Sequence, residues 1–502
     1  MQELRAKIFP IKTGKLVVIL NEKNAKELGL FAGDRVELLN KKNEKKCVAV
    51  IDITHHSVRP NQIGLFEDAL KALGAKNNSI ISTKATEQLK SVDYIKKKML
   101  GEKLSRAEIF EIISDISDER LSEIEATAFV SAVYMKGLDL DETISLTKAL
   151  IEDGNKMDFG KEIIVDKHSV GGTNGRASMI IVPIVASTGL LMPKTSSRSI
   201  TSAAGTADSM EVIASVSLKM DKIMQITKKV GGVIAWGGAV DLAPADDKII
   251  RIEHPLSLDP EGQVIASVLA KKASVGSKYV VIDLPVGKYV KIKDKETALR
   301  MAKKFVQVGR EIGMHVEAVI TNGEEPSGLA FGPALEAKYA LEILEGKRFD
   351  NLAQKSCELA GVLFEMVGMT APTKGYAKAL EILQSGKALE KMREIIKAQG
   401  GKILSSDEIK LARLKKDFKA GTEGIINDIN INTLTKIARI SGAPANKTAG
   451  VMLYKLLGEK VKNGDILMTI YAENEEKLKA AEQFALKNIP FNFKRIILET
   501  IK

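Results

Sequence analysis

The spacing of apolar residues divides the chain into a strand-rich start, a helical stretch and a long alternating region. Within residues 1–84, Lys15–Leu20 is a run rich in β-branched residues, and Gly33–Leu38 is a turn followed by an alternating strand. Between them, Asn24–Leu28 fits one short helix that ends at Gly29. These patterns predict a small, β-rich, barrel-like domain.

Residues 85–155 have a helical pattern. Capping-box sequences begin at Ser105 and Ser122, each with a glutamate three residues later and an apolar stripe of helical period behind it. A third helix is predicted to start at Asp141 and to end at Gly154. We interpret these stripes as packing surfaces without chemistry.

Short apolar runs then alternate with helical segments from about residue 156 to 345. The clearest predicted strands are Ile180–Val185, Val280–Leu284 and Val316–Thr321. This alternation predicts an α/β sheet with the site in loops at the strand ends. From about residue 415, strand-and-glycine character returns. The turn at Lys462–Asp465 is similar to that of biotinyl or lipoyl carriers, but no Met-Lys-Met acceptor accompanies it, which favours a structural role.

The predicted fold is therefore a multi-domain α/β protein, and its length of 502 residues agrees with several cores. The predicted domains are an N-terminal β-rich domain (1–84), a helical lobe (85–155, joined by about 243–274), an α/β core (156–414) and a small α+β C-terminal domain with β-rich character (415–502).

Composition narrows the class of partner. The net charge is +11, but the charges are interspersed and aromatic residues make up only 5%, so small anionic substrates are favoured over nucleic acid. No apolar run approaches membrane-spanning length, and the N-terminus lacks the apolar core of a secretion signal. Cys47 and Cys357 are far apart and lack metal-ligand spacing. We expect a cytoplasmic protein with no membrane partner and no metal.

Two segments carry the candidate chemistry. Asp166–Gly175 (DKHSVGGTNG) places a Lys, a His, hydroxyls and three glycines in ten positions. Ser196–Asp208 (SSRSITSAAGTAD) follows about twenty residues later and adds further hydroxyls and an Arg. Glycine N–H groups and hydroxyls can surround an anion closely. Neither segment has P-loop or dinucleotide-binding spacing, so the sequence predicts a site for free phosphate or a phosphorylated sugar.

Together these segments resemble the paired signature of the thymidine and pyrimidine-nucleoside phosphorylases. The resemblance continues through Gly231–Gly238, Leu242–Asp246 and Ala266–Lys272. It implies an α/β domain that holds phosphate and a helical lobe that holds the nucleoside. The N-terminal extension is similar to that of archaeal AMP phosphorylases, a branch of this family, and is absent from the shorter thymidine phosphorylases.

The resemblance also implies roles for individual residues. His168 falls at the family's active-site histidine, and Gly171 belongs to the glycine segment. Ser267 and Lys271 align with residues that hold the base, whereas Arg251 aligns only after an insertion. The family's phosphate-contacting positions are occupied here by Lys167, Ser169, Ser178 and Thr206.

Two further roles rest on the chemistry of the residues together with the resemblance, which implies that the segment around Asp259 faces the base. Asp259 lies eight residues before Ser267 and could protonate a departing base, or could merely cap the turn before Pro260. Arg198 and Lys291 could bind a 5′-phosphate together with the hydroxyl-rich stretch, or could be solvated cations. The predicted 5′-phosphate contacts are Ser197, Arg198, Ser199, Ile200, Thr201, Ser202 and Lys291.

The expected reaction is phosphorolysis of AMP, with CMP and UMP as further candidates, to free base and ribose 1,5-bisphosphate. Phosphate is a co-substrate, no cofactor is expected, and a homodimer or larger homo-oligomer is expected through the N-terminal domain. Three alternatives stay open: a thymidine or pyrimidine-nucleoside phosphorylase, a nucleic-acid-binding regulator, and a phosphoribosyltransferase. The last would need magnesium, for which the Asp246-Asp247 pair could serve.

Overall fold

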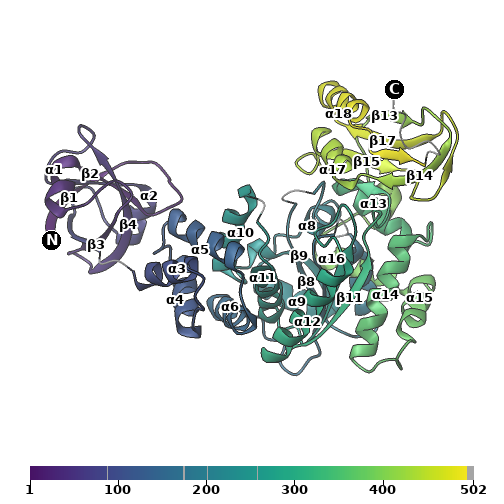
Figure 1. The fold of residues 1–502 in the computed structure, drawn as a ribbon, viewed down its shortest axis with the longest axis horizontal. Coiled ribbons are helices and arrows are strands. Elements are labelled where there is room, and N and C mark those ends of the chain that lie inside the picture. The colour runs from purple at the N-terminus through teal and green to yellow at the C-terminus, as the bar shows by residue number, and fades with distance from the viewer. Residues whose placement is uncertain (87–88, 173–175, 200–201, 257, 495–502) are drawn as a thin grey trace. The chain divides into compact units, whose positions relative to one another are not determined.

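The computed structural model describes residues 1–86, 89–172, 176–199, 202–256 and 258–494 (Figure 1). The chain divides into two compact units, Met1–Ala132 and Val133–Lys502. Across the described ranges, no helix combines the length and the apolar character needed to cross a membrane.

The first unit begins with a closed six-stranded barrel, drawn in purple in Figure 1, which confirms the predicted barrel-like domain. Alternate strand residues such as Leu20, Leu38 and Ile51 fill its interior and are fully buried. The first helix ends at Gly29, whose φ of 68° is a left-handed conformation that glycine adopts without strain. The elements are β1 (Gln2–Ile8), β2 (Val17–Asn21), α1 (Glu22–Leu28), β3 (Arg35–Asn40), β4 (Lys45–Thr54), β5 (Gln62–Leu65), α2 (Glu67–Leu73) and β6 (Ile80–Ala85).

Helices α3 (Lys90–Met99), α4 (Arg106–Ser117) and α5 (Glu123–Lys136) follow the barrel, and both predicted capping boxes form. The prediction that the next helix starts at Asp141 is wrong by one residue. Helix α6 (Leu140–Asp153) begins earlier because Asp139 is its cap and exchanges hydrogen bonds with Glu142.

The second unit contains the α/β sheet. Strands β7 (Val165–Ser169), β10 (Tyr279–Val286) and β11 (His315–Asn322) are parallel, with β10 in the middle. A parallel pair, β8 (Met192–Ser196) and β9 (Gly232–Trp236), continues this layer through a bridge between Ile164 and Leu191. The predicted strands at 280–284 and 316–321 are confirmed.

The predicted strand Ile180–Val185 is wrong, because these residues lie in helix α7 (Ala177–Ala186). Every side chain of α7 is buried, and the helix packs against α13 (Pro333–Leu344), α14 (Asn351–Met366) and α16 (Lys387–Ala398). A helix that is apolar on all sides has no polar face, so its sequence has the same pattern as a strand buried on both faces.

The remaining helices of the core cover the sheet and complete the helical lobe. Helix α6 packs against α10 and α11, and α12 packs against β11. Their bounds are α8 (Thr206–Met210), α9 (Met220–Val230), α10 (Pro244–Leu256), α11 (Glu261–Ser274), α12 (Lys295–Glu311) and α15 (Gly375–Gln384).

The C-terminal region is strand-rich with two helices, and its core is separate from that of the sheet. The short strand β12 (Ala330–Phe331) of the core pairs with β15 and joins the two regions. The elements are β13 (Leu414–Lys419), β14 (Gly424–Ile429), α17 (Ile431–Ile440), β15 (Gly450–Leu453), β16 (Lys460–Val461), β17 (Ile466–Ala472), α18 (Glu475–Lys487) and β18 (Phe491–Phe493).

Removal of residues 1–84 is expected to leave a folded protein. The apolar cluster of the barrel draws only on residues 4–85, so its loss opens no other core. Circular dichroism and a thermal melt of residues 85–502 should show native helix content and a cooperative transition. A truncated chain that is insoluble, or that melts without cooperativity, would contradict this expectation.

Candidate active site

Polar side chains gather where the parallel strands end, which is where open α/β sheets bind ligands. The segment Asp166–Ser169 forms most of β7, so the predicted glycine loop begins only at Val170. Successive side chains of a strand point to opposite faces. Asp166 and Lys167 therefore belong to two different buried charge clusters.

The first cluster surrounds Asp283 on β10, which is fully buried. Its carboxylate accepts hydrogen bonds from Ser169 (2.6 Å) and from Thr321. Lys355 lies 3.0 Å and Lys167 lies 4.0 Å from the same carboxylate, and Lys167 also donates to Ser169. Burial lowers the pKa of Lys167 to about 8, against the opposing effect of Asp283. Two of the predicted phosphate ligands, Lys167 and Ser169, are thus held side by side.

The second cluster surrounds Asp166. Lys194 of β8 lies 3.3 Å from one carboxylate oxygen, and Lys272 of α11 lies 2.7 Å from the other. All three side chains are buried, so two ammonium groups share one carboxylate. Burial and the neighbouring Lys272 lower the pKa of Lys194. Enclosure and the same two lysines hold the pKa of His168 well below its ordinary value, which keeps the imidazole neutral.

A third buried carboxylate, Asp246 of α10, organises the residues predicted to face the base. It accepts hydrogen bonds from Ser267 (2.7 Å) and Gln263 (3.2 Å) and pairs with Lys271 (2.7 Å). Lys271 also lies 3.4 Å from Asp247. The acidic pair considered for magnesium is therefore already engaged by a lysine.

The second predicted loop is organised by Asp208 in the first turn of α8. Asp208 accepts backbone hydrogen bonds from Ser199 (2.6 Å) and Gly205 (2.9 Å). Gly205 is required because a Cβ there would lie 2.5 Å from the carbonyl oxygen of Ser197. The hydroxyls of Ser199 and Ser202 donate to acceptors within the loop. Ile200 and Thr201 lie outside the described residues.

Arg198 projects from this loop, and both terminal nitrogens of its guanidinium pair with carboxylates. Its guanidinium pairs with both oxygens of Glu211 (2.6 and 2.7 Å) and with Asp208 (3.3 Å). It also stacks over Trp236 at 4.9 Å. A substrate phosphate at Arg198 would compete with these carboxylates for the guanidinium.

Lys291 connects the glycine segment to the predicted acid. Its side chain packs on Gly171, whose φ is 74°. A Cβ atom at position 171 would lie 2.3 Å from the Cβ atom of Lys291, so only glycine fits there. Its ammonium forms an ion pair with Asp259, and both side chains are about half exposed.

Members of the Asp166 and Asp246 clusters and of the second loop line a cavity of about 900 Å³, whereas the Asp283 cluster does not reach it. Of the predicted site residues, those that line it are His168, Gly171, Ser197, Arg198, Ser199, Asp259, Ser267, Lys271 and Lys291. Lys167, Ser169, Ser178, Ser202 and Thr206 do not line it. Ser178 and Thr206 are buried in the first turns of α7 and α8.

Sequence reasoning missed four functional candidates on this cavity or next to it. Lys194, Lys272 and Glu253 line the cavity, and Asp208 shapes the loop beside it. Asp208 belongs to the motif Ser196–Asp208 and Lys194 lies two residues before it, so both could have been identified from the sequence. Glu253 falls in an ordinary amphipathic helix, and only its burial distinguishes it.

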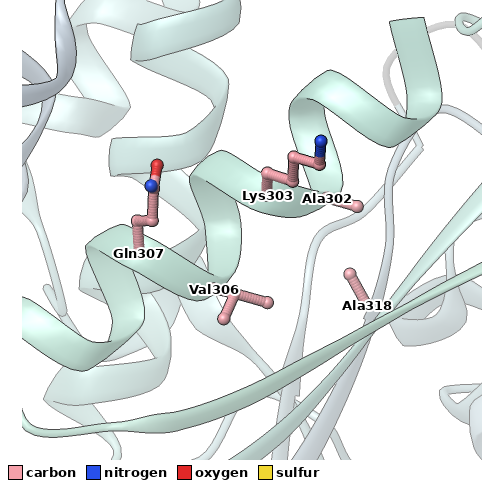
Figure 2. A pocket seen from close by; sticks show the side chains of 5 residues that line it. All are labelled: Ala302, Lys303, Val306, Gln307 and Ala318. Atoms are coloured by element: carbon pink, nitrogen blue, oxygen red, sulfur yellow. The ribbon is translucent and has the colours of Figure 1, made fainter. Parts of the chain in front are cut away.

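A smaller hollow of about 310 Å³ lies between α12 and β11 (Figure 2). Figure 2 shows its side chains: Ala302, Lys303, Val306, Gln307 and Ala318. Only one of them is charged, and the cavity bordered by the clusters is the stronger candidate. Within the described part of the chain, no group of three or more His, Cys, Asp or Glu side chains is placed to hold a metal ion.

The C-terminal domain contacts three segments of the site. Arg439 of α17 donates to the carbonyl oxygen of Ser202 (3.0 Å), and Lys447 pairs with Glu211 (2.9 Å). Tyr289, two residues before Lys291, donates to Asp428 (2.6 Å). The second predicted loop, Glu211 and the Lys291 segment are therefore supported from residues 428–447.

Comparison with known protein families agrees with this arrangement. Residues 92–154 match the helical bundle domain of a glycosyl transferase family, and residues 161–389 match its a/b domain. Residues 425–492 match the pyrimidine nucleoside phosphorylase C-terminal domain. The fold and the site define a glycosyl transferase of the nucleoside-phosphorylase type.

Similar proteins span the whole chain. AMP phosphorylase 1 of Archaeoglobus fulgidus is 48% identical over 98% of this chain and 97% of its own. The AMP phosphorylases of Methanococcoides burtonii and Thermococcus kodakarensis are each 43% identical over at least 99% of both chains. The chain belongs to the AMP phosphorylase family.

Among solved structures, anthranilate phosphoribosyltransferase from Thermus thermophilus superposes with a TM-score of 0.53 at 19% identity. It covers 62% of this chain and 100% of its own. At this identity the likeness concerns the fold alone.

Substitution of Asp166 by Asn is expected to lower stability by about 3–5 kcal/mol, because two buried ammonium groups lose their only shared carboxylate. The loss should be larger at pH 6 than at pH 9, where an amine can shed the uncompensated proton. Denaturant unfolding followed by the fluorescence of Trp236, the single tryptophan, measures it. The exposed Asp221→Asn is the control, and equal losses in both variants would contradict the role of Asp166.

Proposed function

We propose that this chain catalyses the phosphorolysis of AMP, giving adenine and ribose 1,5-bisphosphate, with CMP and UMP as further candidate substrates. The observation that supports this most is a cavity bordered by buried lysines, above all Lys194 and Lys272 on one carboxylate. The full-length similarity to proteins named AMP phosphorylase points to the same reaction. It makes the phosphoribosyltransferase, nucleoside phosphorylase and regulator alternatives less favoured.

The reaction needs phosphate behind C1′, tolerance of positive charge on the sugar, and a proton for the departing base. Lys167, Ser169, Ser178 and Thr206 are the phosphate ligands proposed from sequence, and because none of them lines the cavity in the free protein, the site must open toward them for phosphate to bind there. Hydroxyl groups and a buried ammonium are suitable partners for phosphate oxygens. The reaction requires no cofactor, since phosphate is the second substrate.

Ser267 and Lys271 are the proposed base-facing residues. In the free protein both are held by Asp246 while still lining the cavity. This fixes their positions before the base arrives, which lowers the cost of ordering them.

The 5′-phosphate is proposed to lie near the Ser197–Ser202 stretch, with Arg198 and Lys291 as the cations predicted from sequence. Both line the cavity, but each already has a carboxylate partner. Lys194 is stronger support for a charged substrate than Arg198 or Lys291. It shares the single negative charge of Asp166 with Lys272, so the pair of lysines keeps an excess positive charge. A dianionic phosphate would supply the missing negative charge.

Asp259 is the proton donor proposed from sequence, and it lines the cavity. Its ion pair with Lys291 must open, or the proton must come from elsewhere, before the base can be protonated.

The proposed setting is cytoplasmic, with no nucleic-acid or membrane partner, and with a homo-oligomer that assembles through the N-terminal barrel. Size-exclusion chromatography of residues 85–502 tests the last point: retention of the full assembly would refute it.

Cleavage of AMP should exceed that of adenosine by a factor on the order of 10⁴, because a site built for a charged group is left with unpaired cations by the analogue that lacks it. Lys194→Met should reduce this preference by about 10–100-fold. Steady-state rates with phosphate and each substrate, with the sugar product identified, measure both effects. Equal rates on AMP and adenosine would contradict the proposal that the substrate is a nucleotide, and faster cleavage of thymidine would favour a nucleoside phosphorylase.

Lys167→Ala should raise the KM for phosphate by about 10–100-fold and change the KM for AMP far less, because it removes a charge-assisted contact to the nucleophile only. Initial rates over a grid of both substrates separate the two constants. Lys303→Ala, at an exposed lysine on the small hollow shown in Figure 2, is a control for the loss of a lysine away from the cavity. An unchanged phosphate dependence in Lys167→Ala would show that the phosphate is bound elsewhere.

A further inference from the structure

One buried carboxyl group on the cavity has an oxygen atom that is not satisfied within the described part of the chain. Glu253 lies near the end of α10 and lines the cavity, with only 9% of its surface exposed. Its Oε1 is enclosed and has no hydrogen-bond partner among the described residues. Buried polar atoms are rarely left in this state, because the hydrogen bond lost to water is then not replaced. The position of Glu253 on the cavity wall indicates that a bound molecule supplies the partner.

Glu253 belongs to the same wall of the cavity as the proposed base-facing residues. It follows Asp246 by seven residues, or about two turns, so both side chains project from one face of α10. Asp246 holds Ser267 and Lys271 in place. Ile250 lies between the two acidic residues on α10 and lines the cavity. An apolar surface with polar groups on either side is suited to a flat heterocycle rather than to a phosphate.

The charges around Glu253 favour its neutral form. Burial, followed by the carboxylates of Asp246 on the same helix and Asp259 before α11, raises its pKa to about 8. The ammonium groups of Lys291 and of Lys271 on α11 oppose this shift without cancelling it. At neutral pH the side chain is therefore a carboxylic acid, which has one O–H donor beside one carbonyl acceptor. Such a group pairs with a ligand that carries an acceptor next to a donor.

We propose that Glu253 recognises the base of the nucleotide, with its O–H donating to N1 of adenine and its carbonyl oxygen accepting from the 6-amino group. This rests on the proposed phosphorolysis of AMP. Adenine presents these two groups side by side, so one neutral carboxyl group pairs with both. Glu253 transfers no proton in this role, and the proton for the departing base stays assigned to Asp259. Glu253 is thus a specificity-determining residue, which acts with Ser267 and Lys271.

The test measures the binding of two ligands that differ only in the base. Methyl β-D-ribofuranoside 5-phosphate has the sugar and the phosphate of AMP, with a methoxy group in place of adenine. Isothermal titration calorimetry in the absence of inorganic phosphate gives both dissociation constants. Glu253→Met, which keeps the length of the side chain, should weaken the binding of AMP by about tenfold and that of the sugar phosphate by less than about twofold. Equal weakening of both ligands would give Glu253 a structural role or a role at the sugar, and would overturn the proposal.

Removal of one partner from the ligand gives an independent check. Purine riboside 5′-monophosphate lacks the 6-amino group but keeps N1 and the ring system. Wild type should bind it about 3–10-fold more weakly than AMP, and Glu253→Met should bind the two alike. Glu253→Gln keeps a donor beside an acceptor and should recover most of the affinity for AMP. If Glu253→Met keeps the wild-type preference for AMP, another residue reads the amino group and the proposal is wrong.

The pH dependence of binding separates a hydrogen-bonding acid from a structural side chain. The affinity of wild type for AMP, relative to the sugar phosphate, should fall by up to about tenfold between pH 7 and pH 9, because an ionised Glu253 cannot donate to N1. The ratio of the two constants removes the effect of lysines near the phosphate, such as Lys194, whose pKa burial also lowers. Glu253→Gln should show no such fall. The same fall in wild type and in Glu253→Gln would overturn the proposal.

Failure of the proposed function is a separate outcome. If wild type binds AMP but forms no adenine from AMP and phosphate, the proposed phosphorolysis is wrong, whereas the binding constants still decide the role of Glu253. Absence of AMP binding to wild type would overturn both.

Discussion

The site depends on holding four lysine side chains inside the protein with two aspartates. Lys167 and Lys355 share Asp283, and Lys194 and Lys272 share Asp166. Removal of a charge from water costs several kcal/mol, and a shared carboxylate offsets only part of that cost for each lysine. The parallel strands make the arrangement possible, because they bring Asp166 and Asp283 to neighbouring strands of one sheet. An anion that enters the cavity meets Lys194 and Lys272 and supplies the charge that this pair lacks, so its binding should also stabilise the fold.

Much of the fold could be predicted because it rests on local signals. Capping boxes, glycine stops and alternating strands identified the barrel, helices α4 to α6 and strands β10 and β11. Helix α7 could not be predicted in this way. Its ten residues are all buried, and what distinguishes it from a strand is its packing against α13, α14 and α16, which begin only at Pro333.

In the candidate site, too, features that are local in the sequence could be predicted, and contacts between distant residues could not. The glycine- and hydroxyl-rich motifs are continuous in sequence and were identifiable, including the segment that carries Lys167 and His168. The partners of those residues are far away in the chain: Asp283 and Lys355 join Lys167, and Glu211 occupies Arg198. A sequence shows that a cation is present but not whether a carboxylate already holds it. For the same reason, nothing in the amphipathic pattern of α10 marks Glu253, whose character comes from burial and from two neighbouring carboxylates.

The contacts from the C-terminal domain have a consequence for how the protein is made. Arg439, Lys447 and Asp428 support segments that the ribosome synthesises more than a hundred residues earlier. Domains generally fold in order as the chain emerges. The barrel and the sheet can therefore form while Ser202, Glu211 and Tyr289 still lack these partners. The nascent chain acquires its finished cavity only when almost the whole protein has been translated, so a prematurely terminated product would be folded over most of its length and yet lack an ordered site.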